Sequence, residues 1–552
     1  MVDALPYLVG YPYGCTEQTL SRFLPTVITQ KVLQQLDIDL EAVRQKSANL
    51  NAQEAGDPAE RAKQWQVDER NPVFDEKAVL LMAKQGLARL AAMQVDDGGW
   101  GWFSGANETS QAHTTAHVVR GLLVARELGL HVDQASLTRG IQWLERYQVE
   151  RLQVLDKEGA AKDRLQAKAT NLDALVYRVL ALAGQHSPSM GEYLYRDRTG
   201  LSIYGNTLFA LVLEQTGQKE KLDEVLRFIE QYLVMDEENE TAYLNLPNDT
   251  YWWVWYGSET EAHAYYLKLL TKIAPAGKKA AWLVKYLLNN RKHASYWNAT
   301  RDTAIMVEAF ADYLTRAQEL SPDMHIEIWL DNVLKKQVAI NRENLFTFDG
   351  VLRLEGDALV TGKHRLTIKK QGNGPLYYHA SLDYFSLEDH ITSAGLDLRV
   401  ERNYFKLRRR EASQIGAGAK GQVVEQALEK YDRIALTHLD EVESGDLIEV
   451  ELTVHSKNDY EYLIFEDRKA AGFEPVDSQS GYNGNALGAY VEYRDESVNF
   501  FVRRLARGTH SVSYRLRAEI PGIFSALPTR VYAMYAPELM GNSEEIRLEI
   551  DD

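Results

Sequence analysis

The sequence predicts a multidomain protein with separate α and β parts, a helical part followed by a β-rich one. In the helical part, Met306, Phe310 and Tyr313 fall on one face of a helix. Similar apolar runs cover residues 78–93, 115–128, 172–183, 206–213 and 261–273. Turns rich in glycine and aromatic residues separate these runs, and recurring helix pairs of this kind favour an α/α toroid over residues 1–322.

The apolar periodicity changes to alternation in the β-rich part. Ile448, Val450 and Leu452 alternate with polar residues, and residues 512–518 repeat the pattern. Such alternation is typical of antiparallel strands with one buried face. We therefore expect antiparallel β-sandwich domains over residues 323–389 and 390–552, with an insertion at 417–431 that contains a short helical run.

Composition and charge exclude several classes of protein. The chain has 552 residues, more than one hydrophobic core normally serves. Lys and Arg number 62 against 79 Asp and Glu, and the net charge of −17 makes nucleic acid an improbable partner. No stretch reaches the roughly 20 apolar residues of a membrane span. The N-terminus has no signal-peptide pattern, so we expect the chain to derive from a longer protein.

The chain has one cysteine, Cys15, which excludes an intrachain disulfide. Gln18 follows three positions later, so its side chain neighbours that of Cys15 on a helical turn. Joining the thiol to the carboxamide closes a ring on the order of fifteen atoms, near the 13-atom ring of a helical hydrogen bond. Pro12 and Gly14 suit a helix start. The spacing permits a thioester, although a buried cysteine can also be a small apolar residue.

A thioester would give this turn a reactive electrophile without a metal or cofactor. An amide must expel an amine, whereas a thioester expels a thiolate whose conjugate acid has a pKa near ~8.5. Water also attacks such a bond, so the site has to stay dry until it reacts. Tyr11 and Tyr13 flank the cysteine and are candidate shielding residues.

Residues 11–18, Tyr-Pro-Tyr-Gly-Cys-Thr-Glu-Gln, resemble the Cys-x-Glu-Gln thioester motif of the α2-macroglobulin and complement family, specifically its bacterial members. Other blocks are similar to the same family: residues 97–103, 114–119, 257–262, 296–309, 471–475 and 532–538. The resemblance covers essentially the whole chain. It implies a C-terminal fragment with a toroidal thioester domain (1–322), the C-terminal part of a CUB-like domain (323–389) and a macroglobulin-like domain (390–552).

The resemblance also implies a broad-spectrum endopeptidase inhibitor, not an enzyme, that acts once. A protease would cut a bait segment in the upstream macroglobulin domains, and the exposed thioester would acylate a surface lysine of that protease. Cys15 would be released, and Gln18 would carry the link. No histidine lies in residues 149–159, where some complement proteins place an acyl-shuttling one, which favours direct attack by amines. Met534 and Tyr535, in the closing domain, are further candidate shielding residues.

The resemblance further implies a bacterial, monomeric protein of host defence in the cell envelope. It would lie in the periplasm and be anchored to the inner membrane through a lipoprotein signal upstream of this chain.

Other functions compete with this interpretation. His113 and His117 lie four apart on a predicted helix, but no third ligand accompanies them, so we predict no metal site. Residues 94–100 match a Gln-x3-Gly-x-Trp pattern of terpene cyclases. The acidic motif of such an enzyme would be Asp96 and Asp97, facing a cavity lined by Trp252, Trp253 and Trp255. The β-rich part has no place in such an enzyme. A scaffold without thioester chemistry remains a third alternative.

Overall fold

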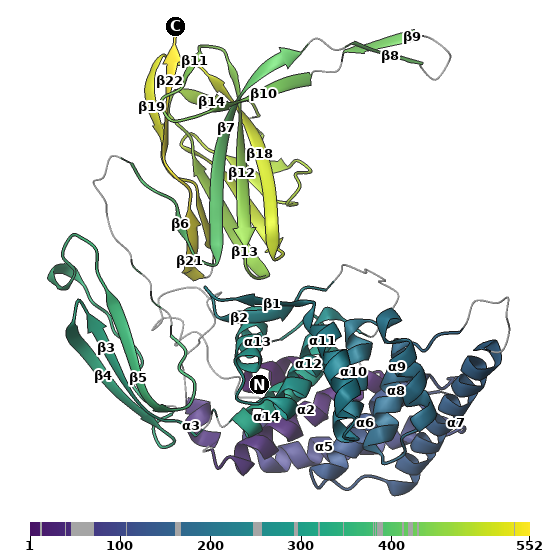
Figure 1. Cartoon of the computed structure of the whole chain (residues 1–552). Coiled ribbons are helices and arrows are strands. Elements are labelled where there is room, and N and C mark those ends of the chain that lie inside the picture. The colour runs from purple at the N-terminus through teal and green to yellow at the C-terminus, as the bar shows by residue number, and fades with distance from the viewer. Residues whose placement is uncertain are drawn as a thin grey trace. The chain divides into compact units, whose positions relative to one another are not determined.

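The structure is a computed structural model of the chain. It describes residues 1–11, 14–38, 40–45, 71–105, 107–159, 167–246, 257–291, 296–317, 319, 321–345, 347–378, 380, 382, 390–410, 413–417, 423–427, 430–477, 479–534 and 536–552. The chain divides into two compact units, residues 1–47 with 65–378 and residues 48–64 with 379–552. Each unit has its own large hydrophobic core (Figure 1).

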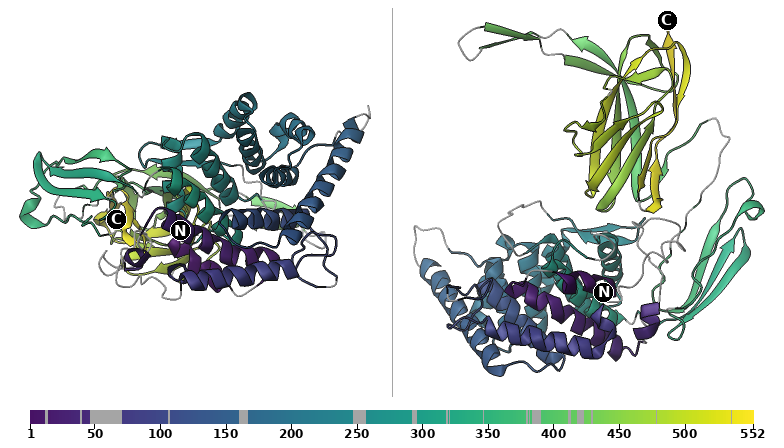
Figure 2. Two further views of the ribbon diagram at one scale, coloured as in Figure 1. Left: turned by 90° about the horizontal axis from the view of Figure 1, so that it is seen from below. Right: turned by 180° about the vertical axis from the view of Figure 1, so that it is seen from behind.

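Helices of the first unit form a closed ring with further helices outside it, as Figures 1 and 2 show from three sides. The ring helices are, in order, α2 (Thr16–Gln35), α6 (Ala112–Glu127), α8 (Asn171–Leu182), α10 (Ile203–Gln215), α12 (Glu259–Ile273) and α14 (Thr300–Ala317). Each contacts the next, and α14 contacts α2, which closes the ring. The outer helices are α5 (Glu76–Ala92), α7 (Gln134–Gly159), α9 (Pro188–Arg196), α11 (Lys219–Glu230) and α13 (Lys278–Asn289). The predicted α/α toroid is confirmed.

The same turn precedes two of the ring helices. Before α6, the Trp100 backbone N–H donates to Thr115 Oγ1 at 2.9 Å. Before α14, the Trp297 N–H donates to Thr303 Oγ1 at 3.0 Å. Each indole N–H also donates to the carbonyl of the residue ten positions earlier, at 2.8 and 3.1 Å. A buried tryptophan thus links α5 to α6 and another links α13 to α14.

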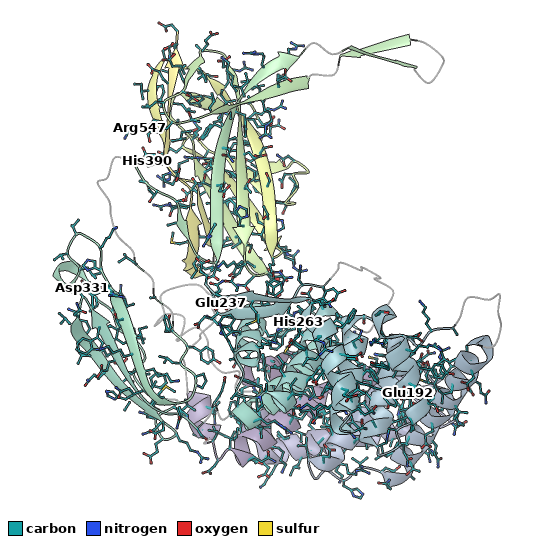
Figure 3. The ribbon with its side chains drawn as sticks, viewed as in Figure 1. Glu192, Glu237, His263, Asp331, His390 and Arg547 are labelled. Atoms are coloured by element: carbon teal, nitrogen blue, oxygen red, sulfur yellow. The ribbon has the colours of Figure 1, made fainter. Side chains whose placement is uncertain are left out.

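Shorter elements cover the ends of the toroid. They are α1 (Leu5–Gly10), α3 (Leu40–Gln45), two strands β1 (Leu233–Asp236) and β2 (Thr241–Leu244), and the one-turn helices η1 (Val2–Ala4), η2 (Pro72–Phe74) and η3 (Arg198–Gly200). His263, labelled in Figure 3, joins β2 to α12. Its Nε2 accepts from the Leu244 N–H at 2.9 Å, and its Nδ1 donates to the Glu259 carbonyl at 2.7 Å.

The change of periodicity after residue 322 marks the end of the helices. Strands β3 (Asp323–Leu330), β4 (Val333–Asn341) and β5 (Leu366–Asn373) form an antiparallel sheet in the order β4-β3-β5, and η4 (Gly356–Ala358) precedes β5. Met324, Ile326 and Ile340 form a small core on this sheet. The first compact unit ends at residue 378, and our boundary at residue 389 stays a prediction.

The second unit is a sandwich of two antiparallel sheets and a smaller mixed sheet, in which β11 and β22 are parallel, around one core. One sheet has the order β10 (Lys430–Leu436), β7 (Leu398–Arg410), β12 (Leu447–Ser456), β18 (Gly508–Ala518), β14 (Phe473–Pro475). Another has the order β15 (Gly481–Tyr482), β16 (Tyr490–Tyr493), β17 (Ser497–Leu505), β13 (Tyr460–Arg468), β20 (Arg530–Ala533), β21 (Ala536–Asn542), β6 (Ala394–Gly395). A smaller sheet has the order β11 (Glu441–Glu443), β22 (Ile546–Asp551), β19 (Gly522–Ala526).

The two alternating runs of the sequence are neighbouring strands of this sandwich. In the β12–β18 ladder, Ile448 pairs with Leu516 and Val450 with Tyr514. All four side chains are buried, since a period of two places them on the same inner face. The expected antiparallel sandwich is confirmed for this unit.

The helical run expected at residues 417–431 was a wrong prediction. This part of the chain instead contains β8 (Ser413–Ala417) and β9 (Val423–Ala427), which pair as an antiparallel hairpin. The reason is its position, because β7 leads into it and β10 leads out of it as a paired ladder. The hairpin extends that pairing, and Val423 with Val424 favours extended backbone.

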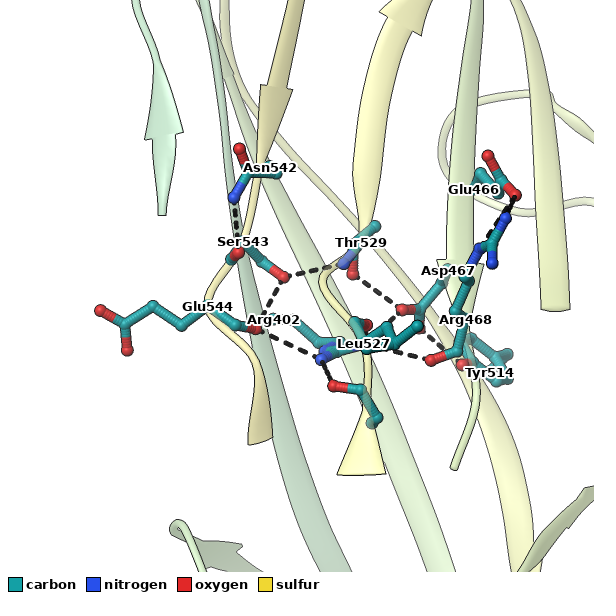
Figure 4. Close-up of polar contacts among 11 residues, drawn as sticks. Arg402, Glu466, Asp467, Arg468, Tyr514, Leu527, Thr529, Asn542, Ser543 and Glu544 are labelled. Carbon is teal, nitrogen blue, oxygen red and sulfur yellow. Dashed lines mark hydrogen bonds and ion pairs between the residues drawn. The ribbon is translucent and has the colours of Figure 1, made fainter. Parts of the chain in front are cut away.

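A buried ion pair joins the two main sheets of the sandwich (Figure 4). Arg402 on β7 donates to Asp467 Oδ1 on β13 at 2.7 Å, and the side chains are 1% and 0% exposed. Tyr514 donates to Asp467 Oδ2 at 2.6 Å, and Thr529 to Oδ1 at 2.8 Å. Arg402 also donates to backbone carbonyls, including that of Leu527 at 2.7 Å. The charges are therefore compensated by well-placed partners.

Candidate functional site

Cys15 and Gln18 lie together at the start of α2. Cys15 is the N-cap residue, in extended conformation, and Gln18 is the third helical residue. The Cys15 N–H donates to Gln18 Oε1 at 3.2 Å, and the Gln18 backbone N–H donates to the Cys15 sulfur. This reciprocal pair is a capping box in which a thiol replaces the usual hydroxyl. It places the thiol and the carboxamide, the two groups that a thioester would join, within one helical turn.

The thiol of this turn is buried, with 8% of Cys15 exposed. Burial raises the pKa of the Cys15 thiol, and the nearby charge of Glu17 raises it further. The free thiol is therefore protonated and inert at neutral pH. An environment that excludes water in this way also slows hydrolysis of any acyl group held there.

The backbone of the turn is held by its neighbours. Arg89 on α5 donates to the Gly14 carbonyl at 2.8 Å. A Cβ at Gly14 would lie 2.5 Å from Arg89 Nη2, so this contact requires a glycine. On the other side, the Thr16 N–H donates to the Trp102 carbonyl at 2.9 Å and Thr16 Oγ1 donates to the Gly101 carbonyl at 2.7 Å. The residues on both sides of Cys15 are therefore fixed.

Glu17 connects the turn to α14. Its Oε1 accepts from Ser21 Oγ on α2 and from Thr300 Oγ1 on α14, each at 3.1 Å. Burial raises the pKa of Glu17, although the Arg301 charge and the two hydroxyl groups lower it in part. The half-buried carboxylate thus has partners on both helices.

Three carboxylates, those of buried Glu261 and Asp302 and of half-buried Glu17, surround the Arg301 guanidinium. Arg301 Nε lies 3.3 Å from Glu261 Oε1. Ser258 Oγ donates to Asp302 Oδ1 at 2.8 Å, and the Ser258 N–H donates to Glu261 Oε2 at 3.2 Å. We name these five residues the carboxylate cluster. It joins the N-termini of α2, α12 and α14 at the end of the toroid where Cys15 lies.

Asp302 gives this cluster a measurable pH dependence. Burial, and then the charge of Glu261, raise the pKa of Asp302 from 3.8 to about 6. The native state therefore binds a proton more tightly than the unfolded state, so ionisation of Asp302 costs stability as the pH rises from about 4 to 7. We expect Asp302→Asn, whose amide oxygen can still accept from Ser258, to gain stability relative to wild type over this range, by at most about 3 kcal/mol.

The free energy of unfolding is measured at pH 4 and pH 7 by chemical denaturation, with tryptophan fluorescence as the signal. All ten tryptophans lie between residues 65 and 329, so this signal reports the first unit. The Asp331→Asn variant is the control. The hydrogen bond from His364 lowers the pKa of Asp331, so its ionisation changes stability mainly below about pH 4, and this variant should not show the gain at pH 7 that Asp302→Asn shows. A difference between Asp302→Asn and wild type that is the same at both pH values would contradict the prediction.

His113 and His117 lie on α6 with their rings stacked, 6.4 Å between centroids. Burial, then the Arg301 charge, lowers the pKa of His113 to about 3, and burial also keeps the pKa of His117 well below its usual value. Both imidazoles are neutral. Within the described ranges no three His, Cys, Asp or Glu side chains are placed to hold a metal ion.

The predicted shielding residues have different surroundings. The Tyr11 ring meets that of Tyr7 edge to face at 6.0 Å, and Tyr7 stacks on Tyr296 at 4.0 Å. Met534 belongs to the second unit, where its N–H donates to the Tyr462 carbonyl at 2.8 Å and 37% of the residue is exposed. Tyr13 and Tyr535 lie outside the described residues. Shielding by these residues stays a prediction.

The Gln-x3-Gly-x-Trp segment forms a structural turn. Gln94 donates to the Gly98 and Ser136 carbonyls, each at 2.8 Å. Asp97 accepts from Ser110 at 2.6 Å and from the Trp143 indole at 2.9 Å. Asp97 therefore closes the turn and is not available as a catalytic acid. The aromatic residues 252–255 lie outside the described part of the chain.

Sequence reasoning missed the residues that hold the turn, namely Arg89, Gly101, Thr300 and Arg301. Residues 257–262 and 296–309 were recognised only as family-like blocks, which was the available signal for Ser258, Glu261, Thr300 and Arg301. No local pattern indicated Arg89.

Comparisons with known proteins find bacterial α2-macroglobulins among the similar chains. Residues 398–538 match the family model of the bacterial α2-macroglobulin MG10 domain. An α2-macroglobulin homologue of Nostoc sp. is 24% identical over 485 residues, which cover 85% of this chain and 24% of the relative. The α2-macroglobulin of Thermotoga maritima is 24% identical over 412 residues, 73% of this chain and 19% of the relative. The chain thus spans about a quarter or less of the length of these curated relatives.

Solved structures of bacterial α2-macroglobulins are also similar. A crystal structure of native Escherichia coli α2-macroglobulin, from domain MG7 to the C-terminus, has 20% identity and a TM-score of 0.40 and covers 100% of this chain and 75% of that chain. The trypsin-activated form has 19% identity and a TM-score of 0.46, covering 98% and 32%. On the sequence relatives and the MG10 match, the chain is a relative of the bacterial α2-macroglobulins, and its residues 398–538 correspond to their MG10 domain.

Proposed function

We propose that this chain carries an internal thioester between Cys15 and Gln18 and is the thioester-bearing part of a protease inhibitor. The observation that supports it most is the capping box, in which the side chains of Cys15 and Gln18 each accept from the other residue's backbone N–H. In bond formation the thiol sulfur adds to the Gln18 carboxamide carbon. The C–N bond then breaks, and ammonia leaves with the thiol proton.

The thioester would then acylate a lysine of an attacking protease. The amine attacks the Gln18 carbonyl, the C–S bond breaks, an amide forms, and the Cys15 sulfur takes up the proton that the amine loses. The relatives named α2-macroglobulin support the protease as the partner. Neutral His113 and His117 are buried on α6, and the proposed route uses no histidine, only direct attack by the amine.

The bond itself is tested by mass spectrometry of the full-length protein from its natural compartment. We expect a mass lower than that of the sequence by one ammonia. Methylamine should add to Gln18 and raise the number of titratable thiols by one, that of Cys15. A mass equal to that of the sequence, with a free thiol before methylamine, would leave the thioester-inactive scaffold as the better interpretation.

We also propose that Tyr11, Tyr13, Met534 and Tyr535 shield the thioester. Replacing Met534 by alanine in the full-length protein should then raise the rate of methylamine opening severalfold. Met540→Ala is a matched control, since Met540 is 40% exposed and Met534 37%. Equal rates for both variants would remove Met534 from the shield.

The natural setting belongs to the same proposal. We propose a monomeric inhibitor with upstream macroglobulin domains, in the periplasm of a bacterium, anchored through an upstream lipoprotein signal. The bacterial relatives support the kind of organism. Among the described residues, no helix has the length and apolar character to cross a bilayer.

A further inference from the structure

We infer that Glu17 is a positioning residue of the proposed thioester: its carboxylate fastens the Cys15–Gln18 turn to α14 through Thr300. The inference rests on the proposed function and deepens it. Glu17 takes no part in the bond itself and acts by holding in place the two groups that form it.

The contacts of Glu17 carry this assignment. Glu17 lies between Cys15 and Gln18 in sequence, so its side chain leaves the same turn. Its Oε1 accepts hydroxyl hydrogen bonds from both sides of the α2–α14 contact, from Ser21 and from Thr300, each at 3.1 Å. The positive Arg301 guanidinium stabilises the negative form. A half-buried carboxylate with these partners can keep one orientation.

The place of this bond in the fold adds to its effect. Helices α2 and α14 are 283 residues apart at Glu17 and Thr300, and their contact closes the toroid. Thr300 is the first residue of α14, so the Glu17 carboxylate also faces a helix N-terminus, which favours negative charge. The thioester turn is therefore fastened at the point where the ring closes.

A rigid turn favours thioester formation, because the reaction between Cys15 and Gln18 depends on the alignment of their side chains. The sulfur must reach the Gln18 carbonyl carbon at a favourable angle, and correct alignment can contribute a large part of the rate of an intramolecular reaction. Arg89 fixes the residue before Cys15, and the carbonyls of Gly101 and Trp102 fix Thr16. On the Gln18 side of Cys15, the hydrogen bond between Glu17 and Thr300 restrains the turn.

The test compares variants of the full-length protein by the ratio of free-thiol chain to thioester chain after folding. Glu17→Ala should raise this ratio about tenfold, because it removes the hydrogen bonds from Ser21 and Thr300. Glu17→Gln keeps an oxygen that can accept from both hydroxyl groups and should restore the ratio to within about twofold of wild type. Thr300→Val should act like Glu17→Ala, and the double variant should add little, because both changes remove one contact.

A purely structural role is separated by Ser202→Ala, which removes the N-cap hydroxyl of α10 at another part of the ring. This control should lower stability without changing the ratio. The inference is overturned if Glu17→Ala matches wild type, if Glu17→Gln is as defective as Glu17→Ala, or if Ser202→Ala raises the ratio equally. Wild-type protein that never loses ammonia would instead overturn the proposed function, so the two failures are distinguishable.

Discussion

Replacing Cys15 by alanine in the full-length protein should abolish covalent capture of proteases, a loss of more than about a hundredfold in cross-linked product. The electrophile cannot form without the sulfur, and the remaining Gln18 amide resists attack by lysine because its leaving group is an amine. The measurement is a gel under denaturing conditions after incubation with a protease, which separates covalent complexes from free protein.

Fold loss is excluded by the tryptophan signal of the first unit. Cys15→Ala removes only a small buried side chain, whose loss should cost roughly 1–2 kcal/mol, so the toroid should stay folded. Wild-type protein treated with methylamine is a chemical control and should lose covalent capture equally. Covalent product that persists in the Cys15→Ala variant would show that another group reacts, and the thioester proposal would fail.

Replacing Asp467 by alanine should destabilise the second unit by about 3–5 kcal/mol. The substitution removes the partner of Arg402, which is 1% exposed, and leaves that guanidinium charged in the sandwich core. Tyr514 and Thr529 also lose the acceptor of their hydroxyl hydrogen bonds.

The second unit has no tryptophan, so its unfolding is followed by the circular dichroism of its strands while tryptophan fluorescence monitors the toroid. We expect the unfolding midpoint measured by circular dichroism to fall in the Asp467→Ala variant. The midpoint measured by tryptophan fluorescence should not change. Glu492→Gln is the control, because it removes an ion pair with Arg494, which is 60% exposed, and should cost less than about 1 kcal/mol. A cost for Asp467→Ala no larger than that of the control would show that the buried pair does not hold the sheets together.

Local patterns predicted much of the fold. Apolar residues at helical spacing correctly placed ring helices such as α12, and strict alternation correctly placed β12 and β18. The failure at residues 417–431 has a physical reason. Whether this segment becomes a helix or a hairpin depends on the paired strands β7 and β10 that flank it, and this pairing is a tertiary property.

In the candidate site, too, local geometry was predictable from the sequence and long-range contacts were not. The sequence by itself determined that Cys15 and Gln18 share a helical turn, because three positions along one helix bring their side chains together. Only the tertiary structure decided what holds that turn. Arg89, Thr300 and Arg301 are distant from Cys15 in the chain and reach it because the ring closes α14 onto α2. Spacing along the chain determines local geometry, whereas burial and long-range partners depend on how the helices pack.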